Sequence, residues 1–312
     1  MGATCVFLFP GQGSQSVGMG KSLFDNHASV RRLFDEASEV TGKSLAKLCF
    51  EGPEAELART DNVQPAITLV NLACLQVLRE QGIAPSAAAG HSLGEYSALC
   101  AAGVFTFSDT LRLVQARGAA MQEAAERHPG GMTAVFGLDR PTLAGICEEA
   151  ARTGSVEVAN HNSPSQVVLT GTKDGLQKAV ELAKKRGAKL CVPLKVSGPW
   201  HSHFMAEAKE RLRQVLAECV VAVPSFPVIA NVTADAHAGA SDAIRQALLA
   251  QLVSPVLWAG SMERLLRDGH TVYLEAGPGK ALAGLMRDIS REAKVFSALQ
   301  PDELPKLRTM AA

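Results

Sequence analysis

What this chain can fold into is limited first by five consecutive residues, Gly90-His91-Ser92-Leu93-Gly94. They follow a run of small residues at 87–89, which is typical of a short strand, and precede a helical stretch over 95–102. Glycines at both ends permit a tight turn from strand to helix, which lifts the serine hydroxyl above the sheet edge at a helix N-terminus. This pattern predicts that Ser92 is a nucleophile. A serine that only caps the helix between two turn glycines is the structural alternative.

Strands and helices alternate on both sides of this turn. Residues 5–9 are a continuous apolar run that Pro10-Gly11 stops, as in a strand buried on both faces. Helical periodicity covers 28–41, 63–80 and 108–127, and one more strand is expected at 271–275. This alternation predicts an α/β fold with a mostly parallel sheet.

The middle of the chain has a different order of elements. The expected strands are 132–138, 156–159, 167–170 and 189–196, with helices at 141–152 and 173–186. The order βαββαβ is ferredoxin-like, and Gly130-Gly131 and Ser197-Gly198-Pro199 are suitable hinges. We therefore expect a large α/β subdomain from 1–127 and 198–312, with a small ferredoxin-like subdomain, 128–197, inserted into it.

Composition excludes several classes of function. The chain has 312 residues with 31 basic and 31 acidic side chains, so it lacks the positive field of a nucleic-acid binder. Its 47% hydrophobic and 20% charged content is that of a soluble globular protein and not of a membrane protein. Seven scattered cysteines without a C-x-x-C pair, and a start without a basic and then apolar leader, predict reduced thiols and a cytoplasmic location.

A nucleophilic serine needs a base, and the chain offers two candidates in one loop. Trp200-His201-Ser202-His203 follows a predicted strand and turn, where loops at the mouth of a parallel sheet lie. The residues alone do not choose between His201 and His203. The H-x-H pair lacks a third ligand at a familiar spacing, so we expect no metal site.

Two polar residues are expected at the edge of the core. Arg117 borders the apolar face of the helix 108–127, where it either binds an anion or covers the core edge with its aliphatic part. Gln251 falls on the same side of a helix as Ile244 and Leu248, just before Ser254-Pro255 ends that helix. Its amide is predicted to point inward and to need partners.

Two further segments have open interpretations. Gly20-Lys21-Ser22 follows a strand, but Gln15 stands where a phosphate-binding loop needs its first glycine, so the loop is expected to offer backbone N–H groups to the active site. The basic cluster Lys184-Lys185-Arg186 with Lys189 is either a solvated helix end or a docking site for an acidic partner or ligand phosphates.

Together these segments resemble the malonyl-CoA:acyl-carrier-protein transacylase family, including the acyltransferase domains of polyketide synthases. The resemblance covers nearly the whole chain and rests on six motifs in order: Phe9-Pro10-Gly11-Gln12-Gly13-Ser14-Gln15, Gly90-His91-Ser92-Leu93-Gly94-Glu95, Gln115-Ala116-Arg117-Gly118, Asn160-His161-Asn162-Ser163-Pro164, Gly198-Pro199-Trp200-His201-Ser202, and Gln251-Leu252 with Pro255-Val256. It implies a hydrolase-like α/β core with a ferredoxin-like insertion.

The resemblance also implies an activity and a set of roles. Ser92 would take a malonyl group from malonyl-CoA as an ester and pass it to the phosphopantetheine thiol of an acyl carrier protein, in fatty-acid or polyketide synthesis. His201 would be the base, oriented by a backbone carbonyl near Gln251, and the N–H groups of Gln12 and Leu93 would form the oxyanion hole. Arg117 would bind the malonyl carboxylate. The implied substrate-binding residues are Arg117, Gln251, His91, Trp200 and Asn162, and no cofactor is implied beyond the coenzyme A and phosphopantetheine that the substrates carry.

One position departs from the family pattern. Phenylalanine commonly precedes the catalytic histidine, whereas this chain has Trp200, whose larger ring is predicted to disfavour methylmalonyl relative to malonyl groups. The alternatives are a serine thioesterase or esterase, which would share Ser92 but have no use for Arg117, and a non-catalytic partner of a synthase, which would tolerate loss of Ser92 or His201. The residues do not decide between a fatty-acid and a polyketide carrier.

Overall fold

The structure is a computed structural model that describes residues 5–299. The expectations about the first four residues of the chain therefore lie outside the described part. Two sheets organise the chain, one of five strands and one of four. Within the described residues, no helix is long and apolar enough to cross a membrane.

The five-stranded sheet is parallel throughout and has the order β7-β2-β1-β8-β9. Its strands are β1 (Cys5–Phe9), β2 (Pro85–Gly90), β7 (Val228–Ile229), β8 (Val272–Glu275) and β9 (Lys294–Ser297). The predicted α/β fold with a parallel sheet is confirmed, and the predicted strands at 5–9, 87–89 and 271–275 are present. The outer strands β7 and β9 were not predicted.

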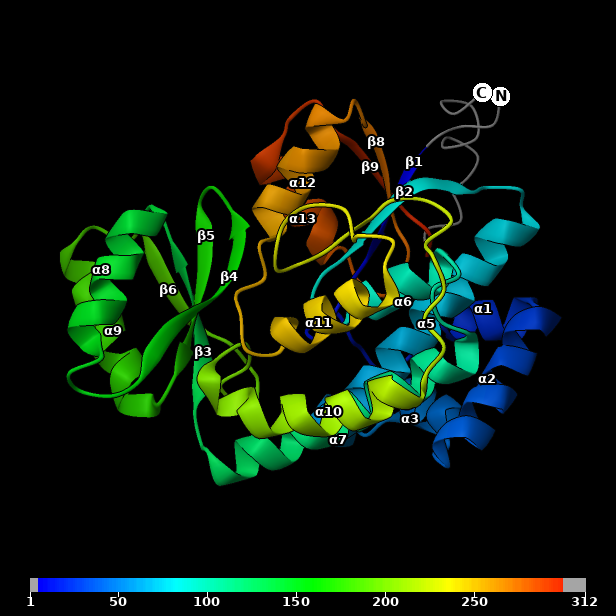
Figure 1. Cartoon of the computed structure of the whole chain (residues 1–312), viewed down its shortest axis with the longest axis horizontal. Coiled ribbons are helices and arrows are strands. Elements are labelled where there is room, and N and C mark those ends of the chain that lie inside the picture. Colours follow the sequence, from blue (N-terminus) through cyan, green and yellow to red (C-terminus); the bar gives the residue numbers. More distant parts are fainter. Residues whose placement is uncertain (1–4, 300–312) are drawn as a thin grey trace.

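Helices cover both faces of this sheet because β1, at its centre, is apolar at every position. Phe7 and Phe9 face the larger core, which contains the helices α5 (Thr60–Glu80) and α7 (Phe107–Arg127). Val6 and Leu8 face the opposite way, against α12 (Trp258–Arg267) and α13 (Ala281–Ile289). Figure 1 shows α12 and α13 beside β8 and β9, across the sheet from α5.

The remaining helices complete the larger part of the molecule. They are α1 (Lys21–Asn26), α2 (Ala28–Thr41), α3 (Leu45–Glu51), α4 (Glu54–Ala58), α6 (Gly94–Ala101), α10 (Ala206–Glu218) and α11 (Ser241–Gln251), with a short 3₁₀ turn at His203–Met205. The helix α10 runs alongside α7 (Figure 1). The periodicity that predicted helices at 28–41, 63–80 and 108–127 corresponds to α2, α5 and α7.

The four-stranded sheet is antiparallel and has the order β4-β5-β3-β6. Its strands are β3 (Gly131–Phe136), β4 (Val156–Ser163), β5 (Gln166–Gly171) and β6 (Leu190–Pro193), and its helices are α8 (Arg140–Ala150) and α9 (Lys173–Lys185). Both helices pack on one face of the sheet, away from the rest of the molecule (Figure 1). This is the ferredoxin-like arrangement that the sequence predicted, except that β6 is shorter than the expected strand 189–196 and ends at Pro193.

The two expected hinge segments lie against each other. A Cβ atom added to Gly130 would lie 3.0 Å from the Cβ of Pro199, so the chain enters and leaves the second sheet side by side. All four strands of that sheet fall inside 128–197. The division of the chain at those residues stays a prediction.

Candidate active site

The turn between β2 and α6 presents Ser92 in a strained backbone conformation. Ser92 has a φ of 49°, in the left-handed region that few residues other than glycine adopt. A Cβ atom on Gly90 would lie 1.9 Å from the carbonyl carbon of Gly94, and one on Gly94 would lie 1.9 Å from the carbonyl oxygen of Phe9 in β1. Only glycine fits at both positions, so the turn packs directly on the central strand of the sheet.

Asn231, two residues beyond β7, holds this turn from below. Its Oδ1 accepts a hydrogen bond from the Ser92 N–H at 2.7 Å, and its Nδ2 donates to the Gly90 carbonyl at 2.7 Å. Asn231 is buried. Asn231 was not predicted as a site residue, because nothing in its local pattern shows that β7 places it beneath a turn some 140 residues earlier.

The structure brings His201, and not His203, to Ser92. The distance between Ser92 Oγ and His201 Nε2 is 2.8 Å, and His201 Nδ1 lies 2.8 Å from the carbonyl oxygen of Gln251. A carbonyl can only accept, so Nδ1 carries the proton and Nε2 presents its lone pair to the serine hydroxyl. His203 is exposed and contacts Glu157 instead. The arrangement is a serine and base pair oriented by a backbone carbonyl and not by a carboxylate.

Burial keeps His201 neutral. Loss of solvent, with a smaller effect of the Arg117 charge, lowers the pKa of His201 from 6.5 to about 3. The imidazole is therefore in its basic form at neutral pH, ready to accept the proton of Ser92.

Arg117 is a fully buried cation whose partners are neutral. Its Nη1 donates to Gln64 Oε1 at 2.9 Å, and its Nη2 donates to Gln251 Oε1 at 3.0 Å and to Ser92 Oγ at 3.0 Å. The guanidinium also lies over the ring of Tyr96. Within residues 5–299, no aspartate or glutamate forms an ion pair with it, and its Nε has no hydrogen-bond partner. A buried charge in this state is suited to bind an anion beside Ser92.

Gln251 connects His201, Arg117 and the Ser92 turn. Its carbonyl oxygen accepts from His201 and its Oε1 accepts from Arg117, while its Nε2 donates to the Ser92 carbonyl at 3.0 Å and to Glu95 Oε2 at 2.6 Å. The inward amide predicted for Gln251 is therefore observed, with every polar atom of its side chain partnered.

Glu95 and His237 form a buried pair next to Gln251 that the sequence pattern did not predict. Glu95 Oε1 lies 2.7 Å from His237 Nε2, and both side chains are 1% exposed. Glu95 Oε2 also accepts from the Asn231 N–H at 3.2 Å. Glu95 thus links the two residues that hold the turn, Gln251 and Asn231. A glutamate in the first turn of a helix gave no sequence signal beyond a favourable interaction with the helix dipole.

Ser92 and His201 line a cleft of about 810 Å³ between the two sheets. The loop at Gly11 forms one wall, and a Cβ on Gly11 would lie 2.4 Å from the His91 carbonyl oxygen, which brings this loop against the serine turn. Gln12 and Leu93 both line the cleft. Leu93 is the first residue after Ser92 and precedes α6, so its N–H lies at a helix N-terminus.

The other predicted substrate-binding residues also line the cleft. His91 Nε2 lies 2.8 Å from Asn162 Oδ1, and Asn162 Nδ2 donates to Gln166 Oε1 at 2.7 Å. Trp200 is buried, and its ring lies 2.6 Å from the position of a Cβ on Gly198. The indole therefore fills the space beside a glycine that has no side chain.

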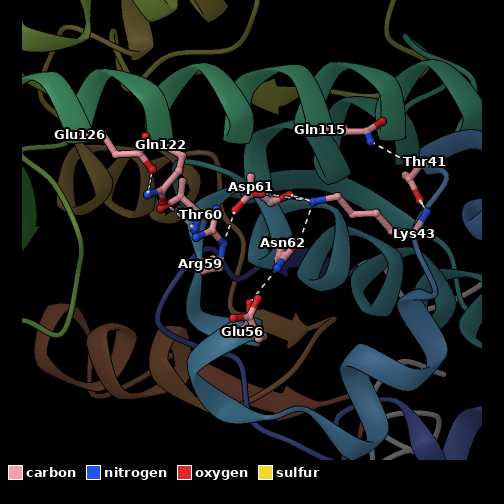
Figure 2. Close-up of polar contacts among 10 residues, drawn as sticks. All are labelled: Thr41, Lys43, Glu56, Arg59, Thr60, Asp61, Asn62, Gln115, Gln122 and Glu126. Carbon is pink, nitrogen blue, oxygen red and sulfur yellow. Dashed lines mark hydrogen bonds and ion pairs between the residues drawn. The ribbon is translucent and has the colours of Figure 1, made fainter.

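A polar cluster at the start of α5 lies behind the glycine-rich loop that forms one wall of the cleft (Figure 2). Pro65 has no N–H to bond the Asp61 carbonyl four residues earlier, and Lys43 Nζ donates to that carbonyl at 2.9 Å. Gln122 of α7 accepts from the Thr60 N–H at 3.3 Å. Thr60 in turn accepts from Gln12 Nε2 at 3.4 Å, so the cluster ties α5 and α7 to the glycine-rich loop.

The fold and the site together define a class of protein: an α/β protein in which a strained serine turn contacts a buried histidine at a cleft between two sheets. In the part of the chain that the structure describes, no group of three or more histidine, cysteine, aspartate or glutamate side chains could hold a metal ion. The acyl transferase domain family matches residues 6–304. The chain belongs to that family and is an acyltransferase.

Relatives with a named activity are similar to this chain over nearly its whole length. A malonyl CoA-acyl carrier protein transacylase of Bacillus subtilis is 44% identical over 299 residues, covering 96% of this chain and 94% of the relative. The structure of the malonyl CoA-acyl carrier protein transacylase of Coxiella burnetii superposes with a TM-score of 0.96 at 36% identity, over 100% of this chain and 98% of the other. A malonyl-transacylase solved in complex with a type II polyketide synthase acyl-carrier protein superposes with a TM-score of 0.95 at 39% identity, over 99% and 100% of the chains.

Proposed function

We propose that this protein transfers a malonyl group from malonyl-CoA to the phosphopantetheine thiol of an acyl carrier protein through an ester on Ser92. The observation that carries the proposal is a single juxtaposition. Ser92 Oγ lies 2.8 Å from the base His201 and 3.0 Å from Arg117, a buried cation without an ion-pair partner in residues 5–299. An acyl group bound to Ser92 and bearing its own carboxylate fits that cation. The names of the relatives agree with this substrate.

In the first half-reaction, Ser92 Oγ attacks the thioester carbonyl while His201 Nε2 accepts the hydroxyl proton. The N–H groups of Leu93 and Gln12 are our proposed oxyanion hole for the tetrahedral intermediate. The carbon–sulfur bond then breaks, and His201 returns its proton to the departing coenzyme A thiolate. The products are malonyl-Ser92 and free coenzyme A.

The second half-reaction repeats these steps with the carrier. His201 removes the proton of the phosphopantetheine thiol, the thiolate attacks the serine ester, and Ser92 leaves with that proton. The Gln251 carbonyl stabilises the imidazolium that forms in each half-reaction, because it accepts from Nδ1 throughout. All reacting groups come from the chain or from the two substrates, so the proposal requires no bound cofactor.

Arg117 gives the site its preference for malonyl. Acetyl groups would leave the buried guanidinium without a counter-charge, whereas the malonyl carboxylate can accept two hydrogen bonds from it. We propose Gln251 and Gln64 as the residues that aim Arg117, since each accepts from a different terminal nitrogen. His91, Asn162 and Trp200 are proposed as the wall against which the acyl thioester lies.

The proposal also includes the location of the protein and the kind of pathway that its carrier serves. We place the protein in the cytoplasm, and its seven free cysteines, five of them buried, support a reducing compartment. The carrier belongs to fatty-acid or polyketide synthesis, since both kinds of carrier accept malonyl groups through the same thiol.

Intact-mass measurement tests the function directly. After exposure to malonyl-CoA, the protein is expected to gain the mass of one malonyl group, and Ser92→Ala is expected to gain nothing. Adding the phosphopantetheine-bearing carrier should return the protein to its starting mass and move the malonyl group to the carrier. Undiminished labelling of Ser92→Ala contradicts the mechanism, and release of free malonate at the same rate with and without carrier identifies a thioesterase instead.

A further inference from the structure

The four-stranded sheet has one face without helices, and that face forms a wall of the cleft. The helices α8 and α9 cover the side that carries Val135 and Leu169. The side chains that alternate with these, Met132, Ala134 and Val168, line the cleft instead. The open face is therefore apolar over β3 and the middle of β5, whereas Asn160 and Asn162 of β4 make it polar next to the Ser92 turn.

This apolar wall extends onto the surface along β6. Leu190 pairs with Phe136 and Val192 with Ala134, and directly opposed residues of antiparallel strands point to the same face. Leu194 follows, with its N–H donating to the Met132 carbonyl at 2.9 Å. We call Leu190, Val192 and Leu194 the β6 row. Their exposed fractions are 54%, 38% and 37%, and they are three of the six large hydrophobic residues that are exposed within residues 5–299.

The row occupies an edge where proteins usually avoid apolar side chains. The strand β6 is last in the sheet order, so its outer edge has no neighbouring strand in the described chain. Exposed apolar edge strands invite association with other molecules, and proteins commonly protect such edges with charges or coverings. Three large apolar side chains exposed at this unpaired edge indicate a surface that is covered when a partner is bound.

The charge around the row is positive. Residues 182–206 contain Lys184, Lys185, Arg186, Lys189 and Lys195 but no aspartate or glutamate. Arg186 pairs with Glu149, whereas none of the four lysines forms an ion pair with a described residue. Lys195 also lines the cleft. A partner with acidic side chains around an apolar patch is complementary to this surface.

We propose that the β6 row with its flanking lysines is the docking surface for the acyl carrier protein, seated so that its phosphopantetheine arm enters the cleft along the apolar wall. The proposal rests on the proposed function, because it assumes that the second substrate is a carrier thiol. A body seated on β6 lies at the end of the wall that leads to Ser92. The extended, thin arm fits the cleft, and the folded carrier stays outside it.

A second copy of this chain fits the surface less well. Lys189 and Lys195 stand symmetrically about Val192, so antiparallel pairing of two β6 strands centred there would place Lys189 of one copy opposite Lys195 of the other. Directly opposed like charges destabilise such a pair. Pro193 also lacks the N–H that a continuous ladder requires.

The test compares two acceptors for the same acyl-enzyme. In the double variant Leu190→Glu/Val192→Glu, the value of kcat/KM for transfer to the phosphopantetheine-bearing carrier is expected to fall by at least about tenfold, mostly through KM. Loading of Ser92 from malonyl-CoA and transfer to free pantetheine should stay within about twofold of the wild-type rates, since neither malonyl-CoA nor free pantetheine needs the docking surface. The matched control is Val220→Glu/Val223→Glu, at valines that are 79% and 70% exposed in another segment, and it should leave all three rates unchanged.

A charge variant provides a second measurement. Lys189→Glu should weaken transfer to the carrier most at low salt, where electrostatic steering is strongest, with little effect on free pantetheine. If it instead raises the KM for malonyl-CoA during loading, the lysine serves the coenzyme A phosphates and the docking assignment is wrong.

Three results would overturn the proposal. The first is unchanged transfer to the carrier by the Leu190→Glu/Val192→Glu variant. The second is an equal loss with free pantetheine, which would show damage to the site and not to docking. The third is a wild-type dimer in sedimentation that the same variant converts to monomer. Failure of Ser92 to accept malonyl in the wild type would refute the proposed function itself and is detected separately.

Discussion

Replacing Arg117 with alanine tests whether this residue selects the acyl group, as distinct from taking part in the transfer reaction. In the wild type, the malonyl carboxylate would enter a site where Arg117 is 1% exposed and its guanidinium is hydrogen-bonded only to neutral oxygens. Without Arg117, that carboxylate would be buried without a counter-charge. Breaking a buried charge pair by removing one partner costs about 3–5 kcal/mol. At about 1.4 kcal/mol per factor of ten, kcat/KM for malonyl loading should fall by roughly two to three and a half orders of magnitude relative to acetyl.

The assay is a competition between malonyl-CoA and acetyl-CoA, read as the ratio of the two acyl-enzymes by intact mass at short times. The ratio isolates the charge, because any damage from the lost contacts of Arg117 with Ser92 and Gln251 affects both donors. Arg112→Ala is the control on the same helix, since that side chain is 60% exposed and pairs with Asp109. Equal losses with both donors would refute the assignment of specificity to Arg117.

Three further outcomes are expected. The pKa of His201 is held near 3, so loading in the free enzyme should lose rate only as the pH falls well below 6.5; an acid limb centred at or above 6.5 would contradict the buried neutral base. The Trp200 ring should favour malonyl over methylmalonyl by about tenfold or more in competition kinetics, and Trp200→Ala should reduce that preference; equal use of both donors by the wild type refutes the steric argument. Glu95→Ala should lower the kcat of loading by about tenfold or more, because Gln251 loses a charge-assisted hydrogen bond of about 1.5–3 kcal/mol. The preference for malonyl should fall together with kcat, and Glu95→Gln should restore part of both. An effect on the melting temperature alone would assign Glu95 to stability.

Features encoded in neighbouring residues were predictable. The apolar run of β1 and the glycines of the Ser92 turn gave the correct strands and the correct turn, because burial on both faces and close backbone approach leave local signs in the sequence. The order of elements in the second sheet was predicted for the same reason. The strand β7 has two residues, which is too short for any periodicity to show.

Features that depend on distant contacts were not predictable from pattern alone. His201 and His203 lie in one loop, and what separates them is the Gln251 carbonyl, which is 50 residues further along the chain. Glu95 and His237 are both polar, and they are buried because the loop that carries His237 packs beneath α6. The family resemblance selected His201, but it assigned no role to His237.

The sharing of Gln251 has a consequence for anyone who wishes to change the cargo. One amide fixes the guanidinium that would hold the far end of the acyl group, and the peptide carbonyl of the same residue aims the imidazole at the near end. In the proposed mechanism, substrate recognition and proton transfer therefore both depend on the position of Gln251. A redesign that moves Arg117 to accept another acyl group will therefore also change the orientation of His201 unless Gln251 keeps its position.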